Sequence, residues 1–374
     1  MATIEKYETG SGATRYRVRY RTPDKRQTDK RGFRTKRDAE AWANQLEVDK
    51  RRGAYVAPAA GRVKLGEYAE EWLGSKHNLK PSTRARYEVV LSTFIANHAQ
   101  VPIGDISRQL VREWVADLSS KRSPATVHKV VGVLRQVLAM AVSDNRLVLN
   151  PADGVELPSV ATVEQRFLTL NQLHTLAGAA GDHRALVYVL GTCGLRFGEV
   201  AELRWRDVDL DRLSIRISRS VVLVDNKFVV GSPKGGKSRT VSLPAFVADL
   251  LRPHRGADSE LIFPDSAGGH MRASNVRRRW WSDAVAKAQL FPRQVDNKTV
   301  FEFKIHELRH TAASLAVQAN ANIKSLQNML GHESAALTLD RYGHLYGSDV
   351  DAVGVAINAL LTRDCGQSVG TDAA

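Results

Sequence analysis

The stretch from His306 to Tyr342 holds side chains whose types and spacing suit chemistry at a phosphodiester. Arg309 follows His306 by three residues, and His332, preceded by a glycine, comes ten residues before Tyr342. Residues three apart on a helix share a face, so His306 and Arg309 can point toward one ligand. An arginine fork can bind phosphate oxygens, and a tyrosine hydroxyl becomes a nucleophile when a base takes its proton. The spacing therefore indicates phosphoryl transfer to a tyrosine.

The same stretch also matches the zinc-protease pattern H-E-x-x-H, through His306, Glu307 and His310. On a helix both histidines could bind zinc, with Glu307 as the base. The glycine and histidine that a metzincin needs further along are both alanines, although Glu333 stands at the chain distance of a thermolysin-like third ligand. Zinc would leave the basic charge of the chain and Tyr342 unexplained. We therefore favour phosphoryl transfer, predict no metal, and interpret Glu307 and His310 as incidental.

Upstream, Arg196 lies in a glycine-framed turn at the expected start of a helix. From such a position a guanidinium can reach a phosphate. Taken singly, each residue has a structural alternative: Arg196 could pair with Glu199, His332 could be a loop residue, and Tyr342 could be a core aromatic. The ordered set is more specific than any of its members.

Residues 231–238 (GSPKGGKS) match the phosphate-loop pattern G-x-x-x-x-G-K-[ST]. That loop must open a helix whose N-terminal amides hold the phosphates. Here residues 239–243 alternate like a strand and reach Pro244, so a nucleotide site is not favoured. We expect a β-hairpin with a basic, glycine-rich tip that carries Lys234 and Lys237.

The elements that must position these residues form a mixed α/β region. Antiparallel strands are expected over residues 213–217, 221–224, 228–230 and 240–243. Gly331 is expected to end a helix as its C-terminal cap, which leaves His332 at a chain reversal. Ser334 can then cap a final helix that carries Tyr342.

Composition limits the classes of protein to which the chain can belong. Its 374 residues suggest two or three domains. Hydrophobic content is 43% and mean hydropathy is -0.29, typical of a globular protein with apolar cores. We find no run of about 18 uncharged apolar residues and no signal-peptide stretch, and so expect a cytoplasmic protein without membrane contact. Cys193 and Cys365 are too few for a cysteine-type metal site.

The net charge of +14 makes nucleic acid the expected partner. Residues 1–62 hold 16 Lys and Arg residues against 8 Asp and Glu residues, in a predicted β-β-β-α unit. Thr35, with Asp38 three residues later, is the expected N-cap of the helix in this unit. Apolar and basic residues alternate strictly in one strand, so a single face would carry Arg15, Arg17, Arg19 and Arg21. Such a face can enter a DNA major groove, although it could also be an ordinary solvated face.

Residues 63 to 150 are predicted to be helical, with helices starting at Pro81 and Pro124. Basic residues near the helix starts and faces are expected to contact DNA, namely Lys80, Arg84, Lys121, Arg122 and Lys129. Residues 53–61 and 155–165 form two predicted linkers. An apolar helix from Val350 to Leu361 is expected near the C-terminus.

In chain order, the catalytic candidates are Arg196, Lys234, His306, Arg309, His332 and Tyr342. This set resembles that of the tyrosine recombinases, the phage-integrase family: an arginine in G-L-R-x-x-E, a hairpin lysine, H-x-x-R, a G-H dipeptide and a later tyrosine. The resemblance covers the whole chain and implies a multidomain fold. Its parts would be a small N-terminal β-sheet plus helix domain for arm-type DNA (residues 1–55), an all-α, SAM-like core-binding domain (63–155), a mixed α+β catalytic domain (165–362) and a flexible tail (363–374).

The resemblance also implies a reaction. Tyr342 would attack a DNA phosphate and form a 3′-phosphotyrosyl link, with His306 as general base. Lys234 would be the general acid for the departing 5′-oxygen, with Lys237 as the alternative. The phosphate would be bound by the remaining members, Arg196, Arg309 and His332. No metal, ATP or other cofactor is needed.

The partners implied are double-stranded attachment-site DNA of core and arm type, a homotetramer of the chain on that DNA, a host DNA-bending factor and a directionality factor. The function would be integration, and with accessory factors excision, of a phage or mobile element. A role in resolution or transposition of another mobile element stays open. Three other classes of protein also remain: a type IB topoisomerase, a DNA-binding regulator without catalysis and, less favoured, a zinc hydrolase. The helix from Val350 to Leu361 would dock on a neighbouring protomer or on its own domain.

Overall fold

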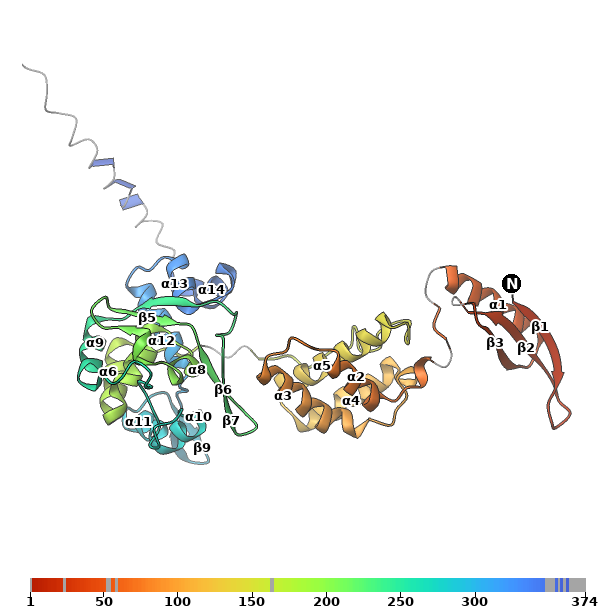
Figure 1. The fold of residues 1–374 in the computed structure, drawn as a ribbon, viewed down its shortest axis with the longest axis horizontal. Coiled ribbons are helices and arrows are strands. Elements are labelled where there is room, and N and C mark those ends of the chain that lie inside the picture. The colour runs from red at the N-terminus through yellow and green to blue at the C-terminus, as the bar shows by residue number, and fades with distance from the viewer. Residues whose placement is uncertain are drawn as a thin grey trace, which may run out of the picture. The chain divides into compact units, whose positions relative to one another are not determined.

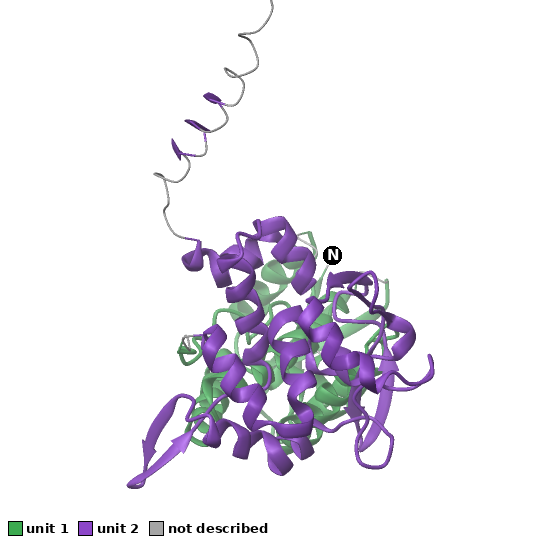
Figure 2. Ribbon diagram, turned by 90° about the vertical axis from the view of Figure 1, so that its left-hand side faces the viewer, with its two compact units in different colours: residues 1–162 green, residues 163–374 purple. Residues whose placement is uncertain are grey.

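The computed structural model describes residues 2–22, 25–51, 55–57, 60–161, 165–346, 354–355, 357–358 and 361–362. The chain divides into two units, residues 1–162 and 163–374, which Figure 2 colours separately. Residues 363–374, parts of both expected linkers and more than half of the expected helix from Val350 to Leu361 lie outside the described residues.

A three-stranded antiparallel sheet opens the first unit, in the order β1 (Thr3–Glu8), β2 (Thr14–Arg21) and β3 (Gln27–Phe33), followed by helix α1 (Lys36–Arg51). This is the predicted β-β-β-α order. Alternation in β2 is confirmed, because Val18 and Tyr20 are buried in a cluster with α1, whereas Arg19 and Arg21 are exposed.

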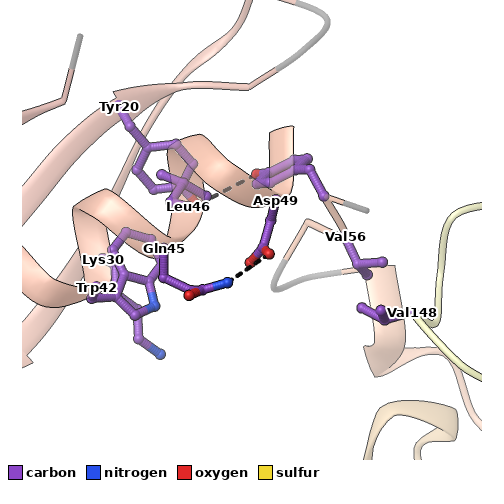
Figure 3. A pocket seen from close by; sticks show the side chains of 9 residues that line it. Tyr20, Lys30, Trp42, Gln45, Leu46, Asp49, Val56 and Val148 are labelled. Carbon is purple, nitrogen blue, oxygen red and sulfur yellow. Dashed lines mark hydrogen bonds between the residues drawn. The ribbon is translucent and has the colours of Figure 1, made fainter. Parts of the chain in front are cut away.

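Helix α1 begins at the predicted N-cap, where Thr35 Oγ1 accepts a 3.1 Å hydrogen bond from the backbone N–H of Asp38. A hollow of about 220 Å³ is lined in part by Tyr20, Trp42 and Asp49 (Figure 3). The aromatic side of the sheet thus faces α1. Since neighbouring side chains of a strand point to opposite faces, the arginines of β2 lie on the other side.

The arginine face of β2 is partly neutralised by β1. Arg17 forms a 2.6 Å ion pair with Glu5, and Arg19 forms a 3.2 Å pair with the same carboxylate. Arg15 is half-buried and Arg21 is exposed. The predicted row of arginines is therefore present, and Arg19 and Arg21 are its most accessible members.

The rest of the first unit is helical, as predicted. Its elements are 3₁₀ turns at Ala60–Arg62 and Ile103–Asp105, α2 (Leu65–Gly74), α3 (Pro81–Val90) with a π-helical continuation (Leu91–Ile95), α4 (Arg108–Lys121) and α5 (Pro124–Ser143). Arg84 is half-buried and donates to the Lys76 carbonyl at 3.2 Å. The other predicted basic residues are exposed, namely Lys80, Lys121, Arg122 and Lys129.

Helix α5 is long and apolar enough, by length and composition alone, to cross a membrane. Its apolar side chains instead form the centre of the helical core. Val127, Leu134 and Leu138 are fully buried and belong to one cluster with Trp72 of α2. Here α5 is the central helix of a bundle.

The second unit mixes helices with short antiparallel strands, as predicted (Figure 1). Its helices are α6 (Leu170–Ala179), α7 (Arg184–Cys193), α8 (Phe197–Ala201), α9 (Ala245–Leu251), α10 (Ala273–Val276), α11 (Ser282–Lys287), α12 (Glu307–Gln318), α13 (Ile323–Leu330) and α14 (Ala335–Tyr342). A π-helical turn (Arg277–Trp281) joins α10 to α11, and 3₁₀ turns lie at Gly181–His183, Trp205–Asp207, Arg252–His254 and Gly343–Leu345. Its strands are β4 (Val208–Asp209), β5 (Ser214–Ile217), β6 (Ser220–Val224), β7 (Lys227–Gly231), β8 (Arg239–Ser242), β9 (Pro292–Val295) and β10 (Lys298–Phe301).

Strand pairing differs from the hairpin expected around Lys234. β8 pairs with β5 in a sheet of order β4-β5-β8, whereas β7 pairs with β6 in a separate ribbon. Residues 232–238 therefore connect two sheets, and the prediction of a hairpin tip is wrong. Alternation predicts that residues 239–243 form a strand, but the choice of its partner depends on tertiary packing that a local pattern does not contain.

Helix α7 packs against α6 and α12 in the core of the second unit. A smaller cluster joins Ala313 of α12, Leu326 and Leu330 of α13, and Tyr342 of α14. Helices α13 and α14 lie side by side at one edge of the unit (Figure 1). The expected nucleophile is thus built into the packing of three helices.

Candidate active site

Arg196 occupies the N-cap of α8, two residues after Gly194, whose left-handed backbone (φ 66°) ends α7. Its backbone N–H and its Nη1 both donate to Glu199, at 2.9 and 3.0 Å, and its Nη2 donates to the Gly331 carbonyl at 3.3 Å. The structural alternative, a pair with Glu199, is confirmed. That pair holds the guanidinium beside the turn that carries His332.

The Glu199 carboxylate is fully buried and is shared by two arginines. Arg239 of β8 donates to it through both terminal nitrogens, at 2.9 and 2.6 Å, and through Nε to the Met329 carbonyl at 3.0 Å. Burial alone would raise the pKa of Glu199, but hydrogen bonds and charge from Arg239, with help from Arg196, outweigh it and hold the pKa below its usual value. Arg239 was not predicted, because a lone arginine in a strand gives no local signal of such a contact.

Arg309 is the second predicted arginine and is buried, with 3% of its surface exposed. Its terminal nitrogens donate to the carbonyls of Gly194 and Leu330, at the ends of α7 and α13. Burial, followed by the charge of Arg196, lowers the pKa of Arg309 to about 9. A guanidinium has five N–H donors, so these two bonds do not exhaust its capacity to bind a phosphate.

His306 is the residue before α12 and lies at the surface. Its pKa is lowered by partial desolvation and then by four positive neighbours, Arg309, Arg196, Arg341 and Lys234. Lys234 is exposed, and the next residue, Gly235, approaches Glu333 in the turn that carries His332. The structure thus brings Lys234 into the electrostatic surroundings of His306. Lys237 is exposed on the same segment and stays the alternative.

The turn after α13 places His332 as predicted. Gly331 has a left-handed backbone (φ 60°) and caps the helix. Nδ1 of His332 shares a 3.0 Å hydrogen bond with Thr338 Oγ1. Burial, followed by the charge of Arg309, lowers the pKa of His332 to about 4, so the ring is neutral near pH 7.

Tyr342 lies at the end of α14, which starts at the predicted cap Ser334. Its side chain is 2% exposed, and its ring is parallel within 5° to that of His332, at a centroid distance of 6.4 Å. Burial raises the pKa of the hydroxyl, and the charges of Arg309 and Arg341 act in the opposite direction. Tyr342 and the predicted phosphate-binding residues therefore share one site.

The Tyr342 hydroxyl shares a 2.8 Å hydrogen bond with Nδ1 of His310. The interpretation of His310 as incidental is therefore wrong. Within the described part of the chain, no hydrogen bond joins Tyr342 to His306, its predicted base. The H-E-x-x-H spacing places His310 on the helix face of His306, but no local pattern reveals a partner 32 residues away.

The geometry gives the zinc interpretation no support. Glu307 accepts a hydrogen bond from the backbone N–H of Lys304, and His310 is engaged by Tyr342. Among the residues that the structure describes, no three His, Cys, Asp or Glu side chains gather where they could hold a metal ion. The hydroxyl of Tyr346, the next tyrosine along the chain, donates to the Ala321 carbonyl at 2.9 Å.

Family models match segments in both units of the chain. Residues 166–348 match the phage integrase family, and residues 5–50, which include the arginine face of β2, match an arm DNA-binding domain. The phiRv2 prophage integrase of Mycobacterium tuberculosis is 31% identical over 349 residues, which cover 88% of each chain.

Solved structures of integrases share the fold of the chain. The Tn1549 transposon integrase in complex with a circular intermediate DNA has a TM-score of 0.66 at 18% identity, over 79% of this chain and 99% of that chain. A lambda integrase tetramer bound to a Holliday junction has a TM-score of 0.56 at 17% identity, over 88% of this chain and 96% of that chain. The chain belongs to the phage integrase family, and it is a tyrosine recombinase.

Proposed function

We propose that the chain recombines DNA at specific attachment sites and so integrates, and with accessory factors excises, a phage or mobile element. The observation that supports this most is the meeting of Arg196, Arg309 and Tyr342 around one turn. Arg196 donates to the Gly331 carbonyl and Arg309 to that of Leu330, while the Tyr342 ring lies parallel to the ring of His332 in the same turn. A phosphate bound by both guanidiniums would lie close to the tyrosine.

In the first chemical step, Oη of Tyr342 attacks the phosphorus of one strand. A phosphorus–Oη bond forms as the bond to the 5′-oxygen breaks. The phenol proton passes to His306, whose lowered pKa keeps the ring neutral, and Lys234 protonates the departing oxygen. The strand is then held as a 3′-phosphotyrosyl ester. Attack by the 5′-hydroxyl of another strand reverses the step, so no ATP or other cofactor is required.

Arg196 and Arg309 would bind the non-bridging oxygens, on which negative charge builds in the transition state. Donors that are fixed before the reaction give the largest electrostatic effect. Both guanidiniums are fixed here by bonds to backbone carbonyls. His332, neutral because its pKa is about 4, would hydrogen-bond the phosphate. These residues supply the charge that a metal ion supplies in other phosphoryl-transfer sites.

The domain division that fits this function is an arm-binding domain at residues 1–55, a core-binding domain at 63–155 and a catalytic domain at 165–362. Separate hydrophobic clusters in the N-terminal sheet, in the helices and in the second unit support it. The arginines of β2 would contact arm sites. Core sites would be contacted by Lys80, Arg84, Lys121, Arg122 and Lys129.

Recombination between two duplexes requires four strand cleavages, and each needs its own tyrosine. We therefore infer a homotetramer on DNA in the cytoplasm of a bacterial host, with a host DNA-bending factor and a directionality factor as further partners. A lambda integrase tetramer bound to a Holliday junction, a structure that shares the fold, supports this inference. The prophage relative favours integration over transposition.

A plasmid that carries both the element's site and the host's site tests the function. Incubation with protein and host extract should yield recombinant junctions, and Tyr342→Phe should yield none. Relaxation of supercoiling without recombinant junctions would instead identify a topoisomerase.

A further inference from the structure

The hydrogen bond between His310 and Tyr342 is the feature of the site that the reaction above leaves without a role. Nδ1 of His310 lies 2.8 Å from Oη of Tyr342. The two rings are tilted by 51° at a centroid distance of 5.8 Å, which places the imidazole at the hydroxyl and not against the ring face. His310 also meets the ring of His306 edge-on, at 5.6 Å. It therefore contacts both the proposed nucleophile and the proposed base.

Packing fixes the ring of Tyr342, whereas a hydrogen bond fixes the direction of its hydroxyl group. Packing against Ala313, Leu326 and Leu330 fixes the ring of Tyr342, and therefore the place of Oη. Packing cannot fix the torsion about the C–O bond, on which the directions of the hydroxyl proton and lone pairs depend. A hydrogen bond from a helix side chain can fix that torsion. Among the described residues, His310 is the one whose side chain is hydrogen-bonded to Oη.

The charge state of His310 limits its ring to one N–H donor. Desolvation, followed by the charges of His306, Arg341 and Arg309, lowers the pKa of His310 to about 4. The ring is neutral near pH 7 and carries one N–H. If that proton were on Nε2, Tyr342 would have to donate its own proton to Nδ1, and the proton would not be available to His306.

We propose that His310 is a positioning residue, whose Nδ1–H donates to Oη of Tyr342 and leaves the phenol proton directed toward His306. The donated hydrogen bond strengthens as negative charge develops on Oη during the attack, because a bond to an ionised acceptor is stronger than one between neutral groups. His310 thus orients the nucleophile and stabilises its ionised form without taking its proton. This role rests on the proposed function of Tyr342.

Three substitutions of His310 distinguish donation of a hydrogen bond to Tyr342 from acceptance of the Tyr342 proton. Asparagine at 310 can place an amide N–H near the position of Nδ1, aspartate places only an acceptor there, and alanine places neither. The assay is single-turnover formation of the covalent protein–DNA adduct on a nicked duplex that carries the core site from the element's own end. DNA affinity and thermal unfolding of each variant are measured in parallel.

We expect His310→Asn to keep the cleavage rate within about threefold, and His310→Asp and His310→Ala to lose about 10- to 100-fold, at unchanged DNA affinity. Thermal unfolding and DNA affinity like those of the wild type in all three variants would exclude a merely structural cause of the loss. Exposed His344, two residues beyond the nucleophile, provides the matched control, and His344→Ala should cleave like the wild type.

Two results would overturn the proposal. Full activity in His310→Ala would show that the hydrogen bond contributes nothing. Activity in His310→Asp combined with loss in His310→Asn would show that His310 accepts the proton. Failure of the proposed function is distinguishable, because the wild type would then form no adduct at all, or Tyr342→Phe would still form one.

Discussion

Arg239 and Glu199 form a two-pronged ion pair, at 2.9 and 2.6 Å, and the same carboxylate pairs with Arg196 at 3.0 Å. The carboxylate has no exposed surface, and the Arg239 side chain has 10%. Through its Nε, Arg239 also holds the Met329 carbonyl near the end of α13. The pair therefore joins the turn that carries Arg196 to the turn that carries His332, and it links β8, α8 and α13.

Glu199→Gln should destabilise the second unit by about 3 kcal/mol or more, because two arginines would lose their shared buried counter-charge. Cleavage should fall as Arg196 loses its anchor. Thermal unfolding and adduct formation measure the two effects. Asp211→Asn, which removes an exposed pair with Arg252 in the same unit, should change stability by less than about 1 kcal/mol. Equal stability of Glu199→Gln and wild type would contradict the buried-support interpretation.

Stability should decrease as the pH falls below about 6.5, the ordinary pKa of histidine. The folded-state pKa values of His310 and His332 are lowered to about 4. Between these values the unfolded chain binds protons that the folded chain does not, so acid favours unfolding. The contribution of the two neutral histidines to stability is complete above about pH 6.5, their pKa in the unfolded chain. It is lost as the pH falls through about 4, their pKa in the folded chain. Urea titrations at pH 7.5 and 5.0 test this, and His310→Asn should reduce the difference. No difference in the wild type would contradict the lowered pKa values.

Arg196→Ala should reduce cleavage by at least about 100-fold while DNA affinity changes little, because the guanidinium acts on charge that develops in the transition state. Arg196→Lys should reduce cleavage almost as much, because an ammonium group lacks the fork of N–H donors that can bind Glu199 and a phosphate together. Single-turnover cleavage and a DNA-binding titration give the two quantities. Arg212→Ala, at a site 86% exposed, is the control. A parallel loss of affinity and cleavage in Arg196→Ala would show a binding role instead.

Several parts of this architecture follow from local sequence. The alternation in β2, the cap at Thr35, the C-cap at Gly331 and the cap at Ser334 each depend on neighbours within a few residues, and each is confirmed. Contacts between distant segments do not follow. The Glu199–Arg239 pair spans 40 residues and the His310–Tyr342 bond spans 32, and both arise from the packing of elements. The wrong hairpin around Lys234 has the same cause, because β5 rather than β7 pairs with β8.

Arg19→Ala combined with Arg21→Ala should weaken binding to arm-site DNA and leave cleavage of a core site intact. These two arginines are the exposed members of the β2 face, whereas Arg17 is paired closely with Glu5. If both contact phosphates, the slope of log affinity against log salt should fall by about 2. Lys36→Ala, in α1 on the other side of the sheet, is the matched control. Unchanged arm-site affinity in the double variant would exclude this face as the DNA contact.

The most direct test of the central claim is covalent capture on a nicked core-site duplex, without added metal and with EDTA present. The wild type should form a protein–DNA adduct whose linkage maps to Tyr342, and Tyr342→Phe should form none while it still binds the duplex. An adduct that persists in Tyr342→Phe, or that forms only when a divalent metal is supplied, would contradict the assignment of Tyr342 as the nucleophile of a metal-independent site.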